Sequence, residues 1–301
     1  MNGNYTNKQR ELIDKLLHSI KQSKAKRAVR FLRQPLKTLY VRLFRAAKRS
    51  REVKARTFWG EKIGVIFPER VSTLIFKNGY FEDDVCLYMI SFLKEGMTFI
   101  DIGAHFGFFT LFGSYLVGVK GRVFAFEPIP DTYHQLQKNI TNYSKYPNID
   151  MYNCAAYSEN IKVKFYDYGL EHSAFNSIFG MRGTDIPFVT NEIMVEARKI
   201  DDVLRKKGIN NIDLIKIDAE SSEIHVLRGI TQTLMSCKPK VILEVGDFAL
   251  NQVPKSKETI TYLQQMGYSP YEVHNGAIVP HVIRDEYEYG NLLFINNNCS
   301  I

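Results

Sequence analysis

The sequence lacks most of the signatures that mark a specialised class of protein. Its 301 residues include only 4 cysteines, 10 prolines and 1 tryptophan, and show no C-x-x-C pair, internal repeat or low-complexity linker. Because the cysteines are far apart, we expect no structural zinc site, no disulfide framework and a reducing compartment; they are Cys86, Cys154, Cys237 and Cys299. No apolar stretch follows Met1, so we also expect no signal peptide and a cytoplasmic protein.

One uncharged stretch is long enough to raise the question of a membrane span. Residues 102–119 carry no formal charge, but they include His105 and four glycines, and Asp101 precedes them. A spanning helix needs about 20 predominantly apolar residues. The glycine and polar content therefore favours a buried turn followed by a helix.

The positive charge is confined to one end of the chain. Residues 1–57 hold 17 Lys and Arg against 3 Asp and Glu, whereas residues 58–301 hold 23 against 29. The overall charge of +8 is therefore the sum of a strongly basic segment and a mildly acidic one. We predict two parts, a basic amphipathic helical arm at 1–57 and a catalytic domain at 58–301.

The arm carries an apolar helical stripe with cations opposite. The stripe recurs at helical spacing and consists of Leu36, Leu39, Tyr40, Leu43, Phe44 and Ala47. Such a pattern is typical of a helix on an anionic membrane surface. Docking of the arm on the body and nucleic-acid binding stay open as alternatives, although low aromatic content argues against the latter.

The rest of the chain alternates between strand and helix patterns. We expect strands at 98–101, 122–127, 150–153, 213–218, 240–245, 268–273 and 291–295, and helices at 108–117, 130–142, 222–235 and 257–266. Alternation of this kind predicts an α/β fold with a mostly parallel sheet and helices on both faces. Residues 160–199 are irregular, with two extra strands at 162–167 and 192–198. A long loop in such a domain is usually functional, and its His172 and Ser177 could face a substrate.

Two acids placed after strands suggest a cofactor with a nucleoside. Asp101 ends one strand, and Gly103 and Gly107 follow in a turn that opens a helix. Glycine lets the backbone approach a ligand, and the helix start offers free N–H groups. Glu127 ends the next strand, where a carboxylate can accept hydrogen bonds from ribose hydroxyls.

Two cofactors fit this pattern to different degrees. A dinucleotide fingerprint requires G-x-G-x-x-G, but His105 stands where its second glycine belongs. Asp101 would repel a pyrophosphate and suits the ammonium group of a methionine moiety. The residues therefore favour S-adenosyl-L-methionine.

The chain from about residue 71 to residue 295 resembles the FkbM-type methyltransferases of the class I S-adenosylmethionine-dependent fold. Six motifs match in order: D-I-G-A-H-F-G at 101–107, G-R-V-F-A-F-E-P at 121–128, K-I-D-D-V-L at 199–204, I-K-I-D-A-E at 215–220, L-R-G at 227–229 and L-E-V at 243–245. The resemblance implies a Rossmann-like, seven-stranded sheet with a reversed last strand. It also implies O-methylation, often of sugar or polyketide hydroxyls.

The resemblance carries cofactor-binding roles onto particular residues. Those expected to bind the cofactor are Asp101, Gly103, Ala104, His105, Gly107, Glu127, Pro128, Asn153 and Ala155. Asp101 and the glycines would line the methionine end, and Glu127 would bind the ribose. Asn153 and Ala155 would lie beside the adenine. His105 stands where the family often has Asn, and either side chain can donate to the cofactor carboxylate.

Methyl transfer to oxygen also needs groups that position the acceptor and remove its proton. Carboxylates can do this directly or through a divalent cation. We expect Asp218, Glu220 and Glu244 to form the catalytic group. Nothing in their spacing requires a metal, and the metal requirement and oligomeric state stay open.

One departure from the family pattern bears on activity. Ser221 stands where the family usually has glycine, and we expect its side chain to cap the following helix. The sequence thus predicts an S-adenosylmethionine-dependent O-methyltransferase whose acceptor is a small molecule, glycan or glycolipid, with contact to an anionic membrane through residues 1–57. A catalytically silent binding protein of the same fold and an RNA methyltransferase remain the alternatives.

Overall fold

The computed structural model describes residues 5–23, 50–179, 191–247, 253–274 and 277–299. The apolar stripe expected at 36–47 lies outside these residues. Among the described residues, no helix is both long enough and apolar enough to cross a membrane. The uncharged stretch at 102–119 instead forms the end of a strand, a turn and a helix, as predicted.

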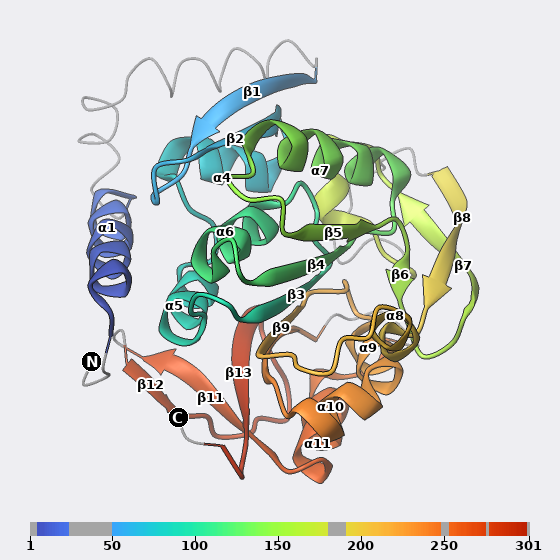
Figure 1. Cartoon of the computed structure of the whole chain (residues 1–301). Helices are drawn as coiled ribbons and strands as arrows, with labels where there is room; N and C mark the ends of the chain where they lie inside the picture. Colours follow the sequence, from blue (N-terminus) through green and yellow to red (C-terminus); the bar gives the residue numbers. More distant parts are fainter. Residues whose placement is uncertain (1–4, 24–49, 180–190, 248–252, 275–276, 300–301) are drawn as a thin grey trace.

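A sheet of eight strands forms the centre of the described structure (Figure 1). In spatial order it runs β12 (Ala277–Pro280), β11 (Tyr268–His274), β13 (Gly290–Asn296), β10 (Lys240–Val245), β9 (Leu214–Ile217), β3 (Thr98–Ile102), β4 (Arg122–Phe126) and β5 (Ile149–Tyr152). The last strand, β13, is antiparallel to both neighbours, and β10, β9, β3, β4 and β5 are parallel. All seven predicted strands and the reversed last strand are confirmed, and β12 adds an unpredicted eighth at the edge.

Helices cover both faces because the strands are apolar on both faces. Successive residues of β3 and β4 alternate between two hydrophobic clusters, so Phe99 and Val123 lie in one, and Ile100 and Phe124 in the other. The first cluster holds α5 (Asp83–Phe92) and α6 (Phe108–Val117). The second holds α8 (Ile200–Lys206), α9 (Glu223–Gly229), α10 (Thr231–Cys237) and α11 (Ser256–Gln265). The single helix expected at 222–235 is thus divided into α9 and α10.

The N-terminal segment contacts the catalytic body in two places. Helix α1 (Asn7–Ser23) lies beside α5 (Figure 1), and its Leu12 and Leu16 are buried in the first cluster. The Gln9 side chain donates to the carbonyl oxygen of Ile90 at 2.6 Å. Strand β1 (Arg51–Arg56) forms an antiparallel hairpin with β2 (Lys62–Phe67), beside α4 (Arg70–Asn78) and α7 (Pro130–Tyr143). The predicted boundary at residue 57 therefore falls at the end of a strand that pairs with the body.

The irregular region predicted at 160–199 is a second, smaller sheet. Strand β8 (Asn191–Arg198) lies between β6 (Ala155–Ala156) and β7 (Ile161–Asp167), so both predicted extra strands are confirmed. The short helix η1 (Ser173–Phe175) follows β7. In Figure 1 this sheet lies on the opposite side of the molecule from α1.

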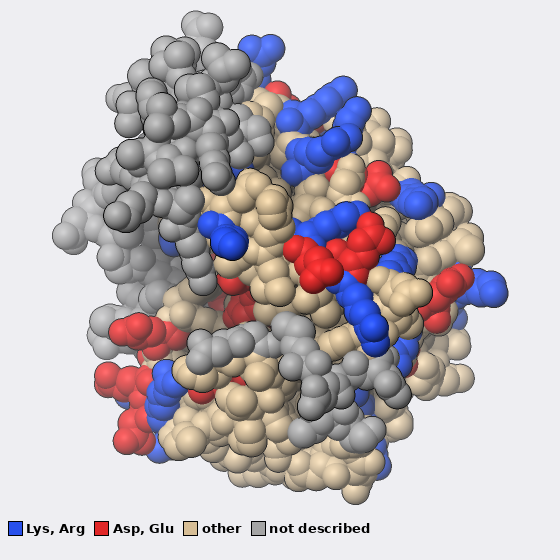
Figure 2. Space-filling model, turned by 90° about the vertical axis from the view of Figure 1, so that its left-hand side faces the viewer, with Lys and Arg blue, Asp and Glu red and all other residues tan. Residues whose placement is uncertain are grey.

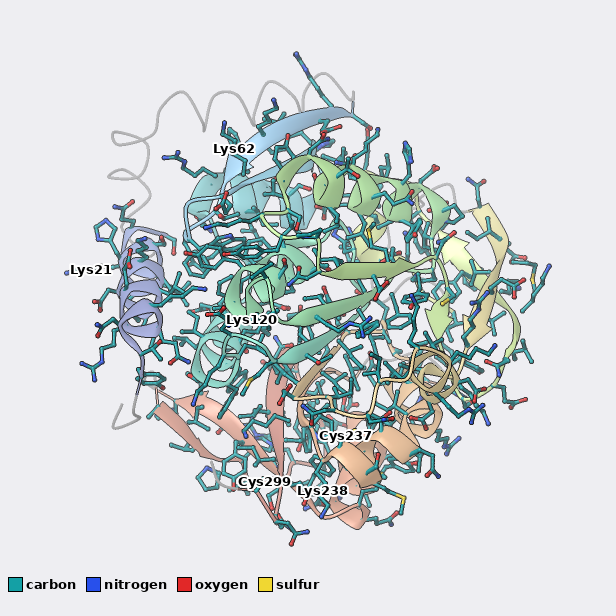
Figure 3. The ribbon with its side chains drawn as sticks, viewed as in Figure 1. Lys21, Lys62, Lys120, Cys237, Lys238 and Cys299 are labelled. Atoms are coloured by element: carbon teal, nitrogen blue, oxygen red, sulfur yellow. The ribbon has the colours of Figure 1, made fainter. Side chains whose placement is uncertain are left out.

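The described surface mixes charges and carries two of the cysteines. On the face shown in Figure 2, basic and acidic side chains lie close together in several places, with uncharged surface between these groups. Cys86 and Cys154 are buried. Cys237 and Cys299 lie at one end of the molecule (Figure 3), where the Cys299 sulfur is 4.0 Å from the Lys238 carbonyl oxygen.

Candidate functional site

A cavity of about 450 Å³ opens at the carboxyl ends of the parallel strands. In open α/β sheets this edge is where ligands bind. Nine of the twelve predicted site residues line it: Gly103, Ala104, His105, Glu127, Pro128, Ala155, Asp218, Glu220 and Glu244. The structure thus brings together residues from the ends of β3, β4, β6, β9 and β10.

The turn after β3 is shaped by glycine. Gly103 has φ +76°, and a Cβ at this position would lie 1.8 Å from the carbonyl oxygen of Asp218. Only glycine fits there, because any side chain would push the turn away from the end of β9. Gly107 lies off the cavity, since a Cβ on it would meet the Leu136 side chain of α7 at 2.6 Å.

Asp101 lies fully buried beneath this turn. Its Oδ2 accepts a hydrogen bond from the Thr110 hydroxyl at 2.6 Å, whereas its Oδ1 has no hydrogen-bond partner among the described residues. Burial raises the pKa of Asp101, and the nearby Lys216 ammonium opposes that rise. A buried carboxylate oxygen without a partner is costly, and Asp101 is not among the residues that line the cavity.

Glu127 is held by two backbone donors. Its carboxylate accepts from the N–H groups of His105 at 2.9 Å and Ile129 at 3.1 Å. Burial raises the pKa of Glu127 to about 8, and these two donors work against the rise. Asn153 supports the same loop by donating to the carbonyl oxygens of Glu127 and Pro128, and its side chain is not among the groups that line the cavity.

His105 makes a hydrogen bond to the second sheet. Its Nε2 lies 2.7 Å from the Ser173 hydroxyl, and its ring stacks on Phe106 with centroids 3.9 Å apart. Burial lowers the pKa of His105 to about 4, so the ring is neutral at physiological pH. One of its two ring nitrogens is thus engaged with the loop of the second sheet, and donation from His105 to the cofactor carboxylate stays a prediction.

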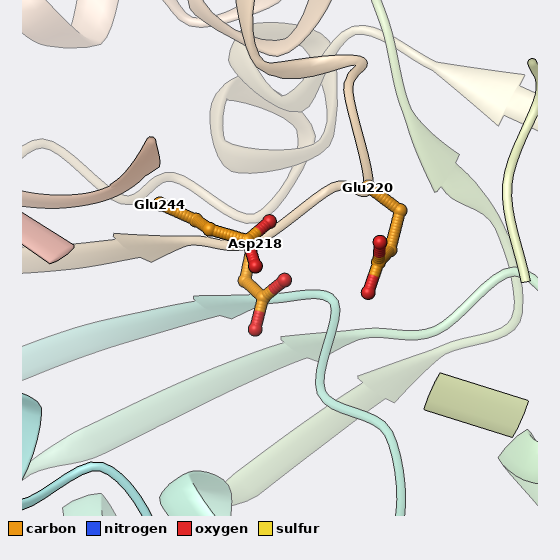
Figure 4. Close-up of side chains that lie close together, drawn as sticks. All are labelled: Asp218, Glu220 and Glu244. Carbon is orange, nitrogen blue, oxygen red and sulfur yellow. The ribbon is translucent and has the colours of Figure 1, made fainter. Parts of the chain in front are cut away.

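The three predicted catalytic carboxylates meet at one end of the cavity. Asp218, Glu220 and Glu244 each offer an oxygen within 4.8 Å of the others (Figure 4). This spacing allows the three to hold a divalent cation, for which carboxylate oxygens are suitable ligands. They come from the ends of β9 and β10, which are paired in parallel.

Lys216 is a site residue that the motif contained but the sequence did not single out. Its Nζ lies 2.8 Å from Asp218 Oδ2 and 4.9 Å from the ring centre of Phe109. Burial alone would lower the pKa of Lys216, but the carboxylates of Asp218, Asp101 and Glu82 outweigh it and raise the pKa. A cation therefore lies beside the carboxylates that are predicted to be catalytic.

Ser221 does not cap the helix, so that expectation was wrong. It has φ +77°, and its buried hydroxyl has no hydrogen-bond partner among the described residues. The residue at the N-cap of α9 is Ser222, which also makes no side-chain cap. Instead, the Glu223 carboxylate accepts from the N–H groups of Ala219 and Ser221 and holds the turn closed.

Further cavity residues come from segments that no motif marked. Arg70, Phe81 and Tyr289 line the cavity from α4, the segment between α4 and α5, and the loop before β13. The Tyr289 hydroxyl donates to the Glu82 carboxylate, although the two residues are 207 positions apart. Burial raises the pKa of Glu82 to about 7. Only the fold brings these segments together.

Comparison with known proteins identifies the family. The model of the methyltransferase FkbM domain matches residues 101–270, which is more than half of the chain. The chain belongs to the FkbM methyltransferase family. The match contains every predicted site residue. The resemblance, the Rossmann-like α/β fold and methyltransferase activity are therefore confirmed for this FkbM methyltransferase.

Two curated relatives and one solved structure illustrate the similarity. The 31-O-demethyl-FK506 methyltransferase FkbM of Streptomyces tacrolimicus is 28% identical over 178 residues, 52% of this chain and 67% of that protein. The hexuronic acid methyltransferase AglP of Haloferax volcanii is 25% identical over 169 residues, 54% of this chain and 62% of that protein. A crystal structure of an FkbM methyltransferase from Methylobacillus flagellatus aligns with a TM-score of 0.41 and 19% identity, over 75% of this chain and 48% of that one.

The cavity fits the cofactor of this methyltransferase class, S-adenosyl-L-methionine. Gly103 and Ala104 bring the backbone of the turn after β3 to the wall of the cavity. Asp101 lies beneath this turn and is not among the residues that line the cavity, so its contact with the methionine ammonium stays a prediction. Glu127 offers acceptors for ribose hydroxyls. When bound, the cofactor supplies an electrophilic methyl group on a sulfonium.

Proposed function

We propose that this FkbM methyltransferase transfers a methyl group from S-adenosyl-L-methionine to a hydroxyl of a glycan, glycolipid or related metabolite. The observation that carries the proposal is the group of three carboxylates beside Lys216 at one end of the cofactor cavity. The names of two relatives support it, since one acts on 31-O-demethyl-FK506 and the other on a hexuronic acid.

Each carboxylate has a separate role toward the acceptor hydroxyl. Asp218 is paired with the Lys216 ammonium, and its carboxylate can accept a hydrogen bond from the hydroxyl and orient it. Glu244, which is buried, then takes the hydroxyl proton as the new carbon–oxygen bond forms. Glu220 contributes the third carboxylate of this group. The products are the methyl ether and S-adenosylhomocysteine, with the proton left on a carboxylate.

The acceptor would enter past the apolar part of the cavity. Val71, Ile75, Phe81 and Phe109 line this part from α4, the segment between α4 and α5, and α6. Arg70 lies at the exposed start of α4 and lines the same region. An apolar wall with an arginine at its edge suits the ring face of a sugar or polyketide that also bears an acidic group.

The basic N-terminal segment would bring the enzyme to an anionic membrane surface. Helix α1 packs on the body through Leu12 and Leu16 and leaves Lys15 exposed. We therefore propose that helix α1 and strand β1 stay packed on the body while the cations of residues 1–57 attract an anionic membrane surface. Sedimentation with vesicles of phosphatidylglycerol, compared with vesicles of phosphatidylcholine alone, tests this; equal binding to both would contradict it.

The function is tested in two steps that separate binding from turnover. Calorimetry first measures the dissociation constant of S-adenosylhomocysteine. Transfer of labelled methyl from S-adenosyl-L-methionine is then measured on glucuronic acid, a glucosyl lipid, a polyketide alcohol and total RNA. We expect transfer to one of the first three acceptors.

The strained turn at Ser221 favours the second candidate, a catalytically silent binding protein. Tight binding without transfer to any acceptor would support that candidate against ours. Transfer to RNA alone would support an RNA methyltransferase. Failure to bind S-adenosylhomocysteine would overturn both the proposed O-methyltransferase and the RNA methyltransferase, because each needs the cofactor.

A further inference from the structure

A turn of the second sheet forms one wall of the cofactor cavity. Ser173, Ala174, Phe175, Asn176 and Ile178 all line the cavity. The turn is fixed to β7, because the Tyr166 N–H donates to the Ser177 carbonyl oxygen at 2.9 Å. From the sequence we expected this region to face the acceptor. The contacts of the turn now indicate which ligand it meets.

Asn176 presents a buried donor that has no partner in the described part of the chain. The Tyr168 N–H donates to Asn176 Oδ1 at 2.8 Å. Because a backbone N–H can only donate, the amide atom facing it must be the oxygen, which settles the orientation of the amide. The opposite atom, Nδ2, is buried and makes no hydrogen bond to any described residue, and only 8% of Asn176 is exposed.

The surroundings of this donor belong to the nucleoside end of the cavity. The neighbouring Ser173 is linked to His105, whose own N–H donates to the expected ribose-binding carboxylate of Glu127. Ile178 packs against the small cluster that contains Ile129 and Phe165. An apolar slot with one polar group is the usual form of a site for an aromatic base. The catalytic carboxylates, by contrast, follow β9 and β10.

We propose that Asn176 is a cofactor-binding residue whose Nδ2 donates a hydrogen bond to the adenosine half of S-adenosyl-L-methionine. The adenine ring nitrogens and the ribose oxygens are acceptors of the required kind. The bond would remove the cost of the buried, unsatisfied N–H, which is about 1–3 kcal/mol. The turn is then a wall for the cofactor, and acceptor recognition falls to α4, the segment between α4 and α5, and the loop before β13. The inference rests on the cofactor and is independent of the acceptor.

The substitution Asn176→Asp isolates the donor. An aspartate retains an oxygen for the Tyr168 N–H and replaces only the Nδ2 donor with an acceptor. Binding of S-adenosylhomocysteine to the full chain is measured by calorimetry. We expect the dissociation constant to rise by about tenfold or more, since a hydrogen bond of roughly 1.4 kcal/mol corresponds to a factor of 10.

Asn191→Asp is the matched control. It makes the same chemical change on β8 of the same sheet, at an exposed residue outside the cavity lining. We expect it to leave the dissociation constant unchanged. An equal loss in both variants would show an effect of added charge and overturn the proposal.

Adenosine as a second probe locates the contact. If the bond is to the nucleoside, Asn176→Asp weakens adenosine and S-adenosylhomocysteine by the same factor. A loss for S-adenosylhomocysteine alone would place the contact on the amino-acid half and contradict the inference. Unchanged binding of both probes would also overturn it.

A measurement on the unsubstituted protein covers the case in which the variant does not fold. The side-chain amide protons of Asn176 are followed by ¹⁵N NMR with and without S-adenosylhomocysteine. A bound acceptor should shift the Nδ2 signals and slow their exchange with water. Signals that do not respond to saturating S-adenosylhomocysteine would rule the contact out.

Discussion

The Nζ of Lys216 lies 2.8 Å from Oδ2 of Asp218, and only 1% of the lysine side chain is exposed. Residues i and i+2 of a strand point to the same face, so a lysine in β9 and an aspartate just after it meet at the cavity. The family motif therefore encodes an ion pair as well as a carboxylate. The pair stabilises the charge that we propose orients the acceptor.

Removing the lysine charge should destabilise the protein. Lys216→Met leaves Asp218 and its neighbouring carboxylates without their buried counter-ion, and breaking one partner of a buried pair costs about 3–5 kcal/mol. Urea unfolding measures the free energy. Lys207→Met is the control, since Lys207 pairs with Asp150 at 3.2 Å with both side chains substantially exposed, and should cost less than about 1 kcal/mol. Equal losses would show that the Lys216 pair contributes no more than a surface pair.

Loss of one catalytic carboxylate should affect turnover more than binding. Glu244→Gln keeps the shape of the side chain but removes the proposed proton acceptor, and such groups contribute about 10²–10⁴-fold to the rate. We expect kcat to fall within that range while the dissociation constant of S-adenosylhomocysteine changes by less than about threefold. A parallel assay with EDTA and with added Mg²⁺ tests whether Asp218, Glu220 and Glu244 act through a cation. A variant with full kcat would refute the role of Glu244.

The turn at residue 221 should become more stable when glycine replaces serine. Ser221 has φ +77°, a left-handed conformation that costs an L-residue roughly 1–2 kcal/mol, and its hydroxyl has no compensating hydrogen bond. Ser221→Gly should therefore raise the free energy of unfolding by about 1 kcal/mol. Gly208→Ala is the reverse control, because Gly208 has φ +66° with open space around a Cβ, and should lose a similar amount. A Ser221→Gly variant less stable than the original would mean that the serine makes a contact outside the described residues.

Binding of the cofactor should release a proton from Glu127. Burial raises the pKa of Glu127 to about 8 from an ordinary value of 4.5, so the free carboxyl is mostly protonated at pH 7. Ribose hydroxyls donate to the ionised form, and binding should lower this pKa. Calorimetry with S-adenosylhomocysteine at pH 7 in phosphate and in Tris should give enthalpies that differ with the buffer, and the difference should disappear in Glu127→Gln. Identical enthalpies in the unsubstituted protein would contradict the assignment.

The raised pKa of Glu127 also determines how the stability of the cofactor-free protein changes with pH. The folded state binds more protons than the unfolded state between pH 4.5 and about 8. The contribution of Glu127 to stability is therefore fully present below pH 4.5 and is lost as the pH rises through about 8. Glu127→Gln should flatten this part of the stability profile.

The sequence predicted the sheet well because buried parallel strands are continuous apolar runs. The strand ends carry Asp101, Glu127, Asp218 and Glu244, so their meeting at one edge followed from the order of strands and helices. Motif resemblance added Glu220, which no periodicity marks. These predictions needed only local pattern and the geometry of a parallel sheet.

The remaining parts of the site depend on contacts between distant segments. Tyr289 and Glu82 are joined across 207 positions, and Asn176 lines the cavity because the segment after β7 folds back and Ser177 pairs with Tyr166. Ser221 was expected to cap α9, but whether a serine caps or strains a turn depends on a backbone angle that its identity does not specify. No sequence spacing encodes such relationships.

Helix α1 should behave as part of the body. Leu16 is fully buried, whereas its neighbour Leu17 is 42% exposed. Leu16→Ala should lower the free energy of unfolding by about 2–5 kcal/mol, through lost burial and a cavity, and Leu17→Ala by less than about 0.5 kcal/mol. Urea unfolding of the two variants is a matched comparison, because the same atoms are removed one position apart. If both changes are small, α1 is detachable, and the arm can act independently of the cofactor site. If Leu16→Ala is costly, α1 is a packed part of the body, and deletion of residues 1–57 removes both this helix and strand β1. Weaker cofactor binding in that deletion would then report lost stability of the body and not a cofactor contact of the arm.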